Sequence, residues 1–255
     1  IAGAKAIREV EPQARMVHVD PMVHAVPPPG RPDLADEARD EAYREAYEAF
    51  DMLAGRLAPD LGGSPEILDI VGVNVYHYSQ VQLDADKKRE ILGPRDPRRK
   101  PLSELLKFAW DRYRRPIIIG ETSGFQESRA QWLRMTMEES LTALNAGVDL
   151  HGVCLYPFVD VPDWWTQKWA KIGIYDVRDK ETFERVPCDA YIQELRDWQK
   201  TLDFAMRNFK DESFIGNLEQ CNGCGGCRAR RVRVRRRDGQ RMRGRGRRHQ
   251  EADRP

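Results

Sequence analysis

Four short apolar segments alternate with helical patterns along the first 206 residues, and this alternation restricts the fold more than any other feature. Strands that are almost continuously apolar are typical of parallel sheets covered by helices on both faces. The sequence therefore predicts an α/β fold. The expected strands cover residues 14–21, 66–78, 117–119 and 150–160. The expected helices cover residues 1–10, 33–57, 102–115, 127–147 and 187–206, with Gly147 as the C-terminal cap of the fourth.

Two architectures fit this alternation, an open doubly wound sheet and a (β/α)₈ TIM barrel. In both, functional side chains gather at the carboxyl ends of the strands. A doubly wound nucleotide-binding sheet would carry a glycine-rich phosphate loop, and the sequence Gly-Glu-Thr-Ser-Gly at residues 120–124 is not one. The strand ends instead carry carboxylates and aromatic rings, which suit a sugar, since rings cover its C–H faces and carboxylates reach its hydroxyl groups. We therefore predict the barrel. The side chains at the strand ends are Asp20, Asn74, Tyr76, His77, Glu121, Tyr156 and Asp160.

Three segments resemble the last three strands of family-one glycoside hydrolases, the β-glucosidase group. They are DIVGVNVYHY at residues 69–78, PIIIGETSG at 116–124 and GVCLYPFVDVPDWW at 152–165. The resemblance implies a barrel of which residues 1–206 form the C-terminal half, roughly strands five to eight.

The same resemblance implies a retaining β-glycosidase of carbohydrate metabolism, with a small-molecule or oligosaccharide glycoside as its substrate. Glu121 matches the family's nucleophile, and Tyr76 would hydrogen-bond its carboxylate and orient it. No metal ion and no organic cofactor is implied. The residues expected to contact the substrate are Asn74, His77, Tyr156, Asp163, Trp164 and Trp165.

The sequence also departs from the family pattern. Gly120 stands where threonine is usual and Asp163 where a sugar-binding glutamate is usual, so the identity of the sugar stays open. A retaining glycosidase needs a second carboxyl group about 5–5.5 Å from the nucleophile. The family supplies it in an Asn-Glu-Pro unit, which this sequence lacks. We expect that unit, and the first half of the barrel, upstream of Ile1.

Other interpretations of these residues remain open. A barrel that keeps the pocket without the acid/base would be a non-catalytic carbohydrate-binding protein. Glu121 could instead cap the following loop or pair with an arginine, and the tryptophans could pack as a lid. Asp160 is expected to hold its own loop. The histidines expected to be structural are His18, His24 and His151.

A basic tail follows, over residues 207–255. Its part from 228 to 255 contains thirteen arginines and three acidic residues, a net of +10. Subtracting this from the overall +1 leaves −9 for residues 1–227, so the body is acidic. We expect the tail to be disordered or non-native. Nucleic-acid binding through phosphate contacts is its less favoured alternative.

The five cysteines divide between the body and the tail. Cys221, Cys224 and Cys227 have the spacing of iron–sulfur or zinc ligands, but their glycine-rich surroundings favour an unstructured segment, and no metal site is predicted. Cys154 and Cys188 are isolated and are expected in or near the core.

No apolar run approaches the roughly 18–20 residues of a membrane span, and no secretory signal is visible. We therefore expect a soluble protein without a membrane partner, and we favour the cytoplasm because the cysteines require no oxidising compartment. A half barrel would leave two sheet edges open, so we expect it to need its missing half or to aggregate.

Overall fold

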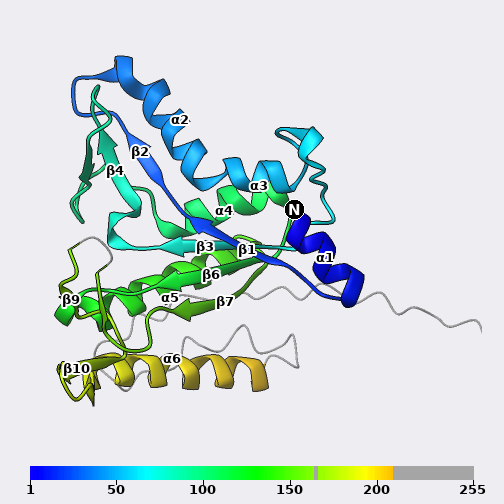
Figure 1. Cartoon of the computed structure of the whole chain (residues 1–255). Helices are drawn as coiled ribbons and strands as arrows, with labels where there is room; N and C mark the ends of the chain where they lie inside the picture. The colour runs from blue at the N-terminus through cyan, green and yellow to red at the C-terminus, as the bar shows by residue number, and fades with distance from the viewer. Residues whose placement is uncertain (164–165, 209–255) are drawn as a thin grey trace, which may run out of the picture.

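The main sheet has four parallel strands that follow one another in chain order. The computed structural model describes residues 1–163 and 166–208 (Figure 1). Residues 164–165 and 209–255 lie outside the described residues, and with them the predictions for Trp164, for Trp165 and for the tail with its three cysteines. The strands of the main sheet are β1 (Val17–Pro21), β3 (Ile70–Val75), β6 (Ile117–Thr122) and β7 (Leu150–Leu155).

One helix precedes the first of these strands, others connect the strands, and the last described element is also a helix. The helices are α1 (Ala2–Val10), α2 (Ala35–Ala46), α3 (Glu48–Leu53), α4 (Leu102–Tyr113), α5 (Arg129–Asn145) and α6 (Asp189–Asn208). Short 3₁₀ turns are η1 (Pro32–Leu34), η2 (Pro59–Leu61), η3 (His77–Ser79) and η4 (Gln126–Ser128). The predicted α/β fold with a parallel sheet is confirmed.

Three small sheets, which the sequence did not predict, are built from the loops. A lobe beside the main sheet combines α2 with a sheet of order β2-β4-β5 (upper left in Figure 1). Its strands are β2 (His24–Val26), β4 (Gln80–Leu83) and β5 (Arg89–Ile91). The other two sheets pair β8 (Val161–Pro162) with β9 (Trp169–Ala170) and β10 (Tyr175–Asp179) with β11 (Glu184–Pro187).

The strand order favours one of the two predicted architectures. A doubly wound sheet reverses its order at a switch point, whereas here the order β1-β3-β6-β7 runs in one direction throughout. In a (β/α)₈ barrel, too, each strand pairs with the next parallel strand along the chain. In the described residues, however, the sheet is not closed, because β1 and β7 each pair with one neighbour only.

Helices cover one face of the main sheet, here called the outer face. Val71, Val73, Ile117 and Ile119 are at most 1% exposed there and pack with residues of α4 such as Leu106. Burial of such side chains contributes roughly 1.5–3 kcal/mol each, so this layer is the main stabilising core.

The opposite, inner face is uncovered in the described residues. Val17 and Val19 of β1 are 48% and 46% exposed. Cys154 of β7 is exposed as well, while Cys188 is half-buried beside α5 and α6. The expectations that both sheet faces are covered and that Cys154 lies in or near the core are therefore wrong for this structure. Cys154 lies on the face of β7 that no described helix covers.

The expected helix 33–57 is interrupted at Tyr47, whose φ of −136° and ψ of −19° are not helical. The Tyr47 ring packs against Phe108 and Tyr113 of α4, with centroids 5.3 and 6.4 Å away. Packing of this ring into the core thus overrides the helical pattern. The expected cap at Gly147 is confirmed: it has a φ of +86°, and its N–H donates to the carbonyl of Leu144.

Asp51 connects α3 to α4 through a buried hydrogen-bonded cluster. Its carboxylate is 3% exposed. It accepts hydrogen bonds from the Tyr43 hydroxyl at 2.7 Å, the Tyr113 hydroxyl at 3.0 Å and the Arg112 guanidinium. Burial raises the pKa of Asp51, but the hydrogen bonds from Arg112 and the tyrosines outweigh it, so the pKa is lowered.

Replacing Asp51 with Asn should cost roughly 2–3 kcal/mol of unfolding free energy at pH 7, since it leaves Arg112 without its carboxylate. The pKa of Asp51 is lower in the folded state, so its stabilisation is present above the unfolded pKa of about 3.9 and is lost as the pH falls through the folded pKa. Urea unfolding at pH 7 and at pH 3 should show the deficit of D51N shrinking in acid. Asp111→Asn, which removes the exposed pairs with Lys107 and Arg114, is the control and should change little. An equal loss in both variants would contradict this role of Asp51.

Candidate active site

A β-bulge decides which way Glu121 points. Val73 pairs with Ile119, but the next residue of β3, Asn74, pairs with Glu121, so Gly120 has no partner on β3. Regular alternation would place Glu121 on the outer face with Ile117 and Ile119. The extra residue turns the Glu121 side chain away from the core, as bulges beside active sites often do.

Tyr76 meets Glu121 across the two strand ends. Its hydroxyl donates a hydrogen bond of 3.0 Å to Oε2 of Glu121. The Tyr76 ring is 8% exposed, and burial followed by the nearby charge of Glu121 raises the pKa of its hydroxyl far above the ordinary value. Tyr76 therefore stays protonated and serves as a fixed donor. The contact predicted between these two residues is present; their catalytic roles remain predictions.

Asn74 lies beside this pair on β3. Its Oδ1 atom is buried and accepts no hydrogen bond from the described residues. An added Cβ at Gly120 would come within 3.0 Å of this oxygen and 2.8 Å of Cγ1 of Val19. Close packing on the inner face therefore favours glycine at position 120, and the buried Asn74 oxygen has no donor among the described residues.

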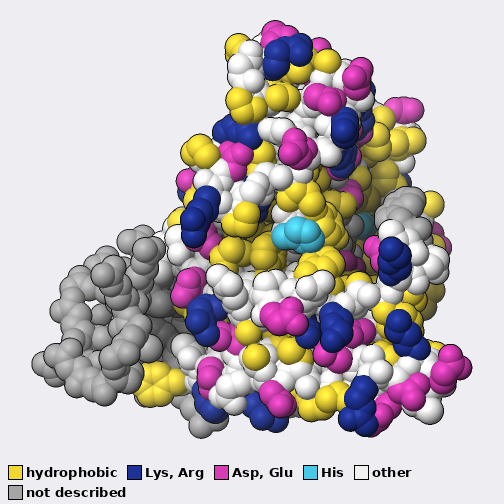
Figure 2. Space-filling view, turned by 90° about the vertical axis from the view of Figure 1, so that its left-hand side faces the viewer, with side chains coloured by type: hydrophobic (Ala, Val, Ile, Leu, Met, Phe, Trp, Pro, Cys, Tyr) yellow, Lys and Arg dark blue, Asp and Glu magenta, His cyan; other side chains and the backbone are white. Residues whose placement is uncertain are grey.

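Aromatic rings surround the strand ends. Tyr78 stacks on Tyr76, with centroids 5.1 Å apart and planes 13° apart, and is 48% exposed. Tyr156 and Phe158, which follow β7, are 40% and 61% exposed. Figure 2 views the molecule from this side and shows a histidine among hydrophobic side chains in a hollow beneath the upper lobe. A surface of this kind suits the C–H faces of a sugar.

The residues after β7 are held by a buried ionic cluster. Asp160, 5% exposed, accepts hydrogen bonds from the backbone N–H groups of Ile172, Gly173 and Val177. The expectation that Asp160 holds its loop is confirmed. Arg129 of α5, 4% exposed, donates to the carbonyl of Gly173 at 2.8 Å and also pairs with Asp176.

A second contact ties this loop to β6. The Ser123 hydroxyl, two residues beyond Glu121, donates to the carbonyl of Ile172 at 2.6 Å. The loop that contributes Tyr156 and Phe158 is thereby fixed relative to Glu121. Arg129, Ser123 and Tyr78 were not predicted to belong to the site. Tyr78 and Ser123 lie within the quoted segments 69–78 and 116–124, but their roles depend on the stacking with Tyr76 and on the bond to the Ile172 carbonyl, which only the structure shows.

The other predicted residues have varied surroundings. Asp163 accepts hydrogen bonds from the backbone N–H and hydroxyl of Thr166, so it also shapes its own turn. Asp20 is half-buried at the end of β1, and burial raises its pKa. The histidines expected to be structural bond within the protein: His18 to the Ile67 carbonyl, His24 to the Arg98 carbonyl and His151 to Asp149.

The described residues contain no cluster of three or more His, Cys, Asp or Glu side chains that could hold a metal ion. None of the described helices is long and apolar enough to cross a membrane.

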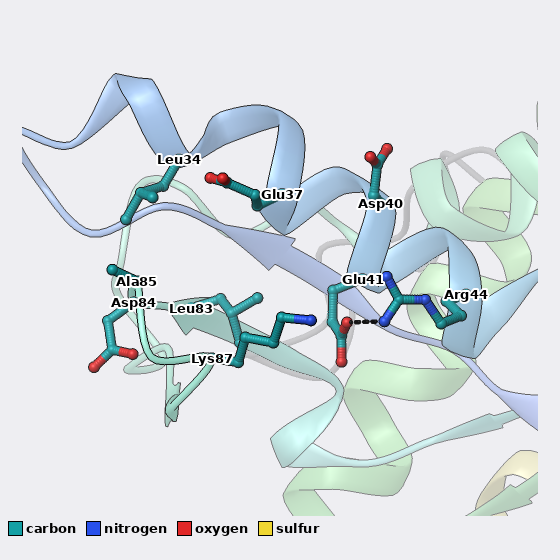
Figure 3. A pocket seen from close by; sticks show the side chains of 9 residues that line it. All are labelled: Leu34, Glu37, Asp40, Glu41, Arg44, Leu83, Asp84, Ala85 and Lys87. Atoms are coloured by element: carbon teal, nitrogen blue, oxygen red, sulfur yellow. Dashed lines mark hydrogen bonds and ion pairs between the residues drawn. The ribbon is translucent and has the colours of Figure 1, made fainter.

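Two hollows lie away from Glu121. One, of about 170 Å³, lies between α2 and the turn after β4 and is lined by charged side chains, including the ion pair of Glu41 with Arg44 (Figure 3). The other, of about 1130 Å³, lies between the lobe and α4 and is lined by rings such as Tyr43, Tyr47 and Phe108.

Comparisons with known proteins show the fold. No protein-family model matches the chain, and no curated protein matches it. Among solved structures, a family 1 β-glucosidase from Thermotoga maritima has a TM-score of 0.60 at 18% identity, over 75% of this chain and 52% of that one. The AHE enzyme from Alicyclobacillus herbarius has a TM-score of 0.61 at 16% identity, over 76% of this chain and 53% of that one. A hyperthermophilic β-glucosidase mutant has a TM-score of 0.56 at 20% identity, over 76% and 45%.

The chain thus shares its α/β fold with β-glucosidase barrels. It spans about half the length of the structures it matches. At these identities the likeness concerns the fold alone, and it agrees with the single direction in which the strands are ordered.

Substitution of Gly120 tests the packing behind Glu121. Gly120→Ala should lower the unfolding free energy by about 1–2 kcal/mol, because the new methyl group displaces Val19 or Asn74. Gly152→Ala on β7, where an added Cβ meets nothing within 4 Å, is the matched control and should be nearly neutral. Urea midpoints compare the two; equal midpoints would contradict the tight packing at Gly120.

Proposed function

We propose that the chain is part of a retaining β-glycosidase, with Glu121 as its nucleophile. The observation that carries the proposal is the hydrogen bond from the buried Tyr76 hydroxyl to Glu121 at the bulged end of β6. A carboxylate at the carboxyl end of a barrel strand, held by a neutral donor and bordered by aromatic rings, fits attack on a sugar ring.

In the first step, a carboxylate oxygen of Glu121 attacks the anomeric carbon of a β-linked glycoside. The bond from this carbon to the leaving-group oxygen breaks, and that oxygen takes a proton from the second carboxyl group. In the second step, the second group removes a proton from water, which displaces Glu121 and regenerates its carboxylate. Tyr76 keeps Glu121 oriented in both steps.

We assign the second carboxyl group to a segment outside this chain, by correspondence of β1, β3, β6 and β7 with strands five to eight of a barrel. The strand order supports this correspondence, and so does the half-length match to the β-glucosidases. The uncovered inner face, with Val17 and Val19 exposed, is the surface that the remaining strands would cover. Asn74, His77, Tyr156 and Asp163 contact the sugar in this proposal, as do Trp164 and Trp165.

Glu121→Gly in the intact protein, expressed with its upstream segment, should lower kcat on a nitrophenyl β-glycoside by at least about 10³-fold. Added azide should restore turnover by taking the place of the missing carboxylate, and the product should be the α-glycosyl azide. Rates and product stereochemistry, followed by absorbance and NMR, provide the test.

Glu127→Gln, an exposed glutamate shortly after β6, is the control and should keep wild-type activity. Unchanged turnover in the Glu121 variant would refute the nucleophile. Glycoside binding by a wild type that turns over no substrate would instead favour a carbohydrate-binding protein.

Tyr76→Phe should lower kcat by about 10- to 100-fold with a small change in KM, because it removes only the donor that orients the nucleophile. Tyr78→Phe keeps the stacked ring and serves as the control, with kcat close to that of the wild type. Equal kcat values in wild type and Y76F would show that the hydrogen bond has no part in catalysis.

A further inference from the structure

Arg98 and Arg99 are neighbours on the loop between β5 and α4, but their guanidinium groups have very different surroundings. Arg98 is fully engaged: it pairs with Asp96 and donates to the Pro27 carbonyl and the Gln82 side chain. Arg99 has one hydrogen bond, of 2.8 Å from Nη1 to the Leu92 carbonyl, and no carboxylate within ion-pair distance among the described residues.

The position of Arg99 is fixed by the backbone around Gln80. The Gln80 side chain accepts a hydrogen bond from the Lys100 N–H and donates one to the Lys100 carbonyl, both of 2.8 Å. The Leu92 N–H donates to the Gln80 carbonyl. Gln80 thus bonds both to Leu92, which accepts from Arg99, and to Lys100, the residue after Arg99. Because Gln80 directly follows η3, these contacts hold Arg99 near the end of β3.

His77, on that 3₁₀ turn, is the second member of the cluster. Its Nδ1 atom is buried and has no hydrogen-bond partner among the described residues. Its ring packs edge-on against Phe125, four residues after Glu121, with centroids 4.6 Å apart. Burial, and after it the charge of Arg99, lowers the pKa of His77. The hydrogen bonds around Gln80 place Arg99 beside the 3₁₀ turn that carries His77, whose neutral imidazole has an unused ring nitrogen.

Burial also lowers the pKa of Arg99 itself. The charge of Asp96, which is itself paired with Arg98, offsets this effect only in part. A partly desolvated guanidinium that has no carboxylate in direct contact is unfavourable, whereas a bound oxyanion would accept several of its five N–H donors. A neutral imidazole supplies one more N–H donor. This arrangement matches a carboxylate or phosphate group better than a neutral hydroxyl group.

We propose that Arg99 and His77 form an anion subsite beside the glycoside pocket, which binds a carboxylate or phosphate group on the substrate. This inference rests on the proposed function for the nature of the ligand, and on the cluster itself for the charge. It narrows the substrate class to anionic β-glycosides.

The test measures binding by calorimetry at low salt to the intact protein, expressed with its upstream segment. The probes are methyl β-glucoside, methyl β-glucuronide and inorganic phosphate. Wild type should bind the glucuronide about tenfold tighter than the glucoside, the gain expected from one charge-assisted contact. Arg99→Gln should abolish this preference, and Arg99→Lys should retain part of it.

Arg95→Gln, an exposed arginine on the same loop, is the matched control and should keep the preference. The arginine-rich tail is the same in every variant, so its own binding of anions cancels. Circular dichroism confirms that each variant is folded.

The two proposals fail in different ways. Equal binding of glucoside and glucuronide by wild type, or a preference that survives Arg99→Gln, overturns the anion subsite and leaves the glycoside pocket intact. Phosphate binding that depends on Arg99, without binding of either glycoside, supports the subsite and counts against the glycosidase. No Arg99-dependent binding of any anionic probe overturns the subsite.

Discussion

The unpaired Gly120 in β6 is the constraint on which the candidate site depends. A regular strand would turn Glu121 toward the helices, into the layer of Ile117 and Ile119. One extra residue reverses this direction and brings the carboxylate to the Tyr76 hydroxyl. Glycine is favoured at this position, since a Cβ would come within 2.8 Å of Cγ1 of Val19 and 3.0 Å of Oδ1 of Asn74. Backbone register and side-chain packing thus depend on one another here.

Apolar side chains are buried on one face of the main sheet and exposed on the other. The outer face carries the largest cluster of buried apolar side chains in the described residues, and the Asp51 cluster lies beside it. The inner face leaves valines of β1 uncovered and both sheet edges unpaired among the described residues. Exposed edges and apolar side chains favour association with further strands. This agrees with the proposal that further strands of a barrel cover the inner face.

Sequence patterns predicted the elements that bury long apolar runs and missed those set by tertiary contacts. The four main strands and Gly147 followed from local chemistry. The three-residue strand β2 is too short for any periodicity, and the helix break at Tyr47 depends on the packing of its ring against α4. The pair of Tyr76 with Glu121 was predicted from a family resemblance. The role of Arg99 was not predicted, because the sequence does not show that Arg98 pairs with Asp96 while Arg99 makes a single side-chain hydrogen bond.

The most direct test of the account is to trap the covalent intermediate. The intact protein would be treated with a 2-deoxy-2-fluoro-β-glycoside that carries a good leaving group, and the labelled residue would be located by peptide mass spectrometry. The account predicts one glycosyl group on Glu121, with no label in Glu121→Gly. A label on another carboxylate, or steady turnover of ordinary β-glycosides by a protein in which Glu121 is never labelled, would contradict it.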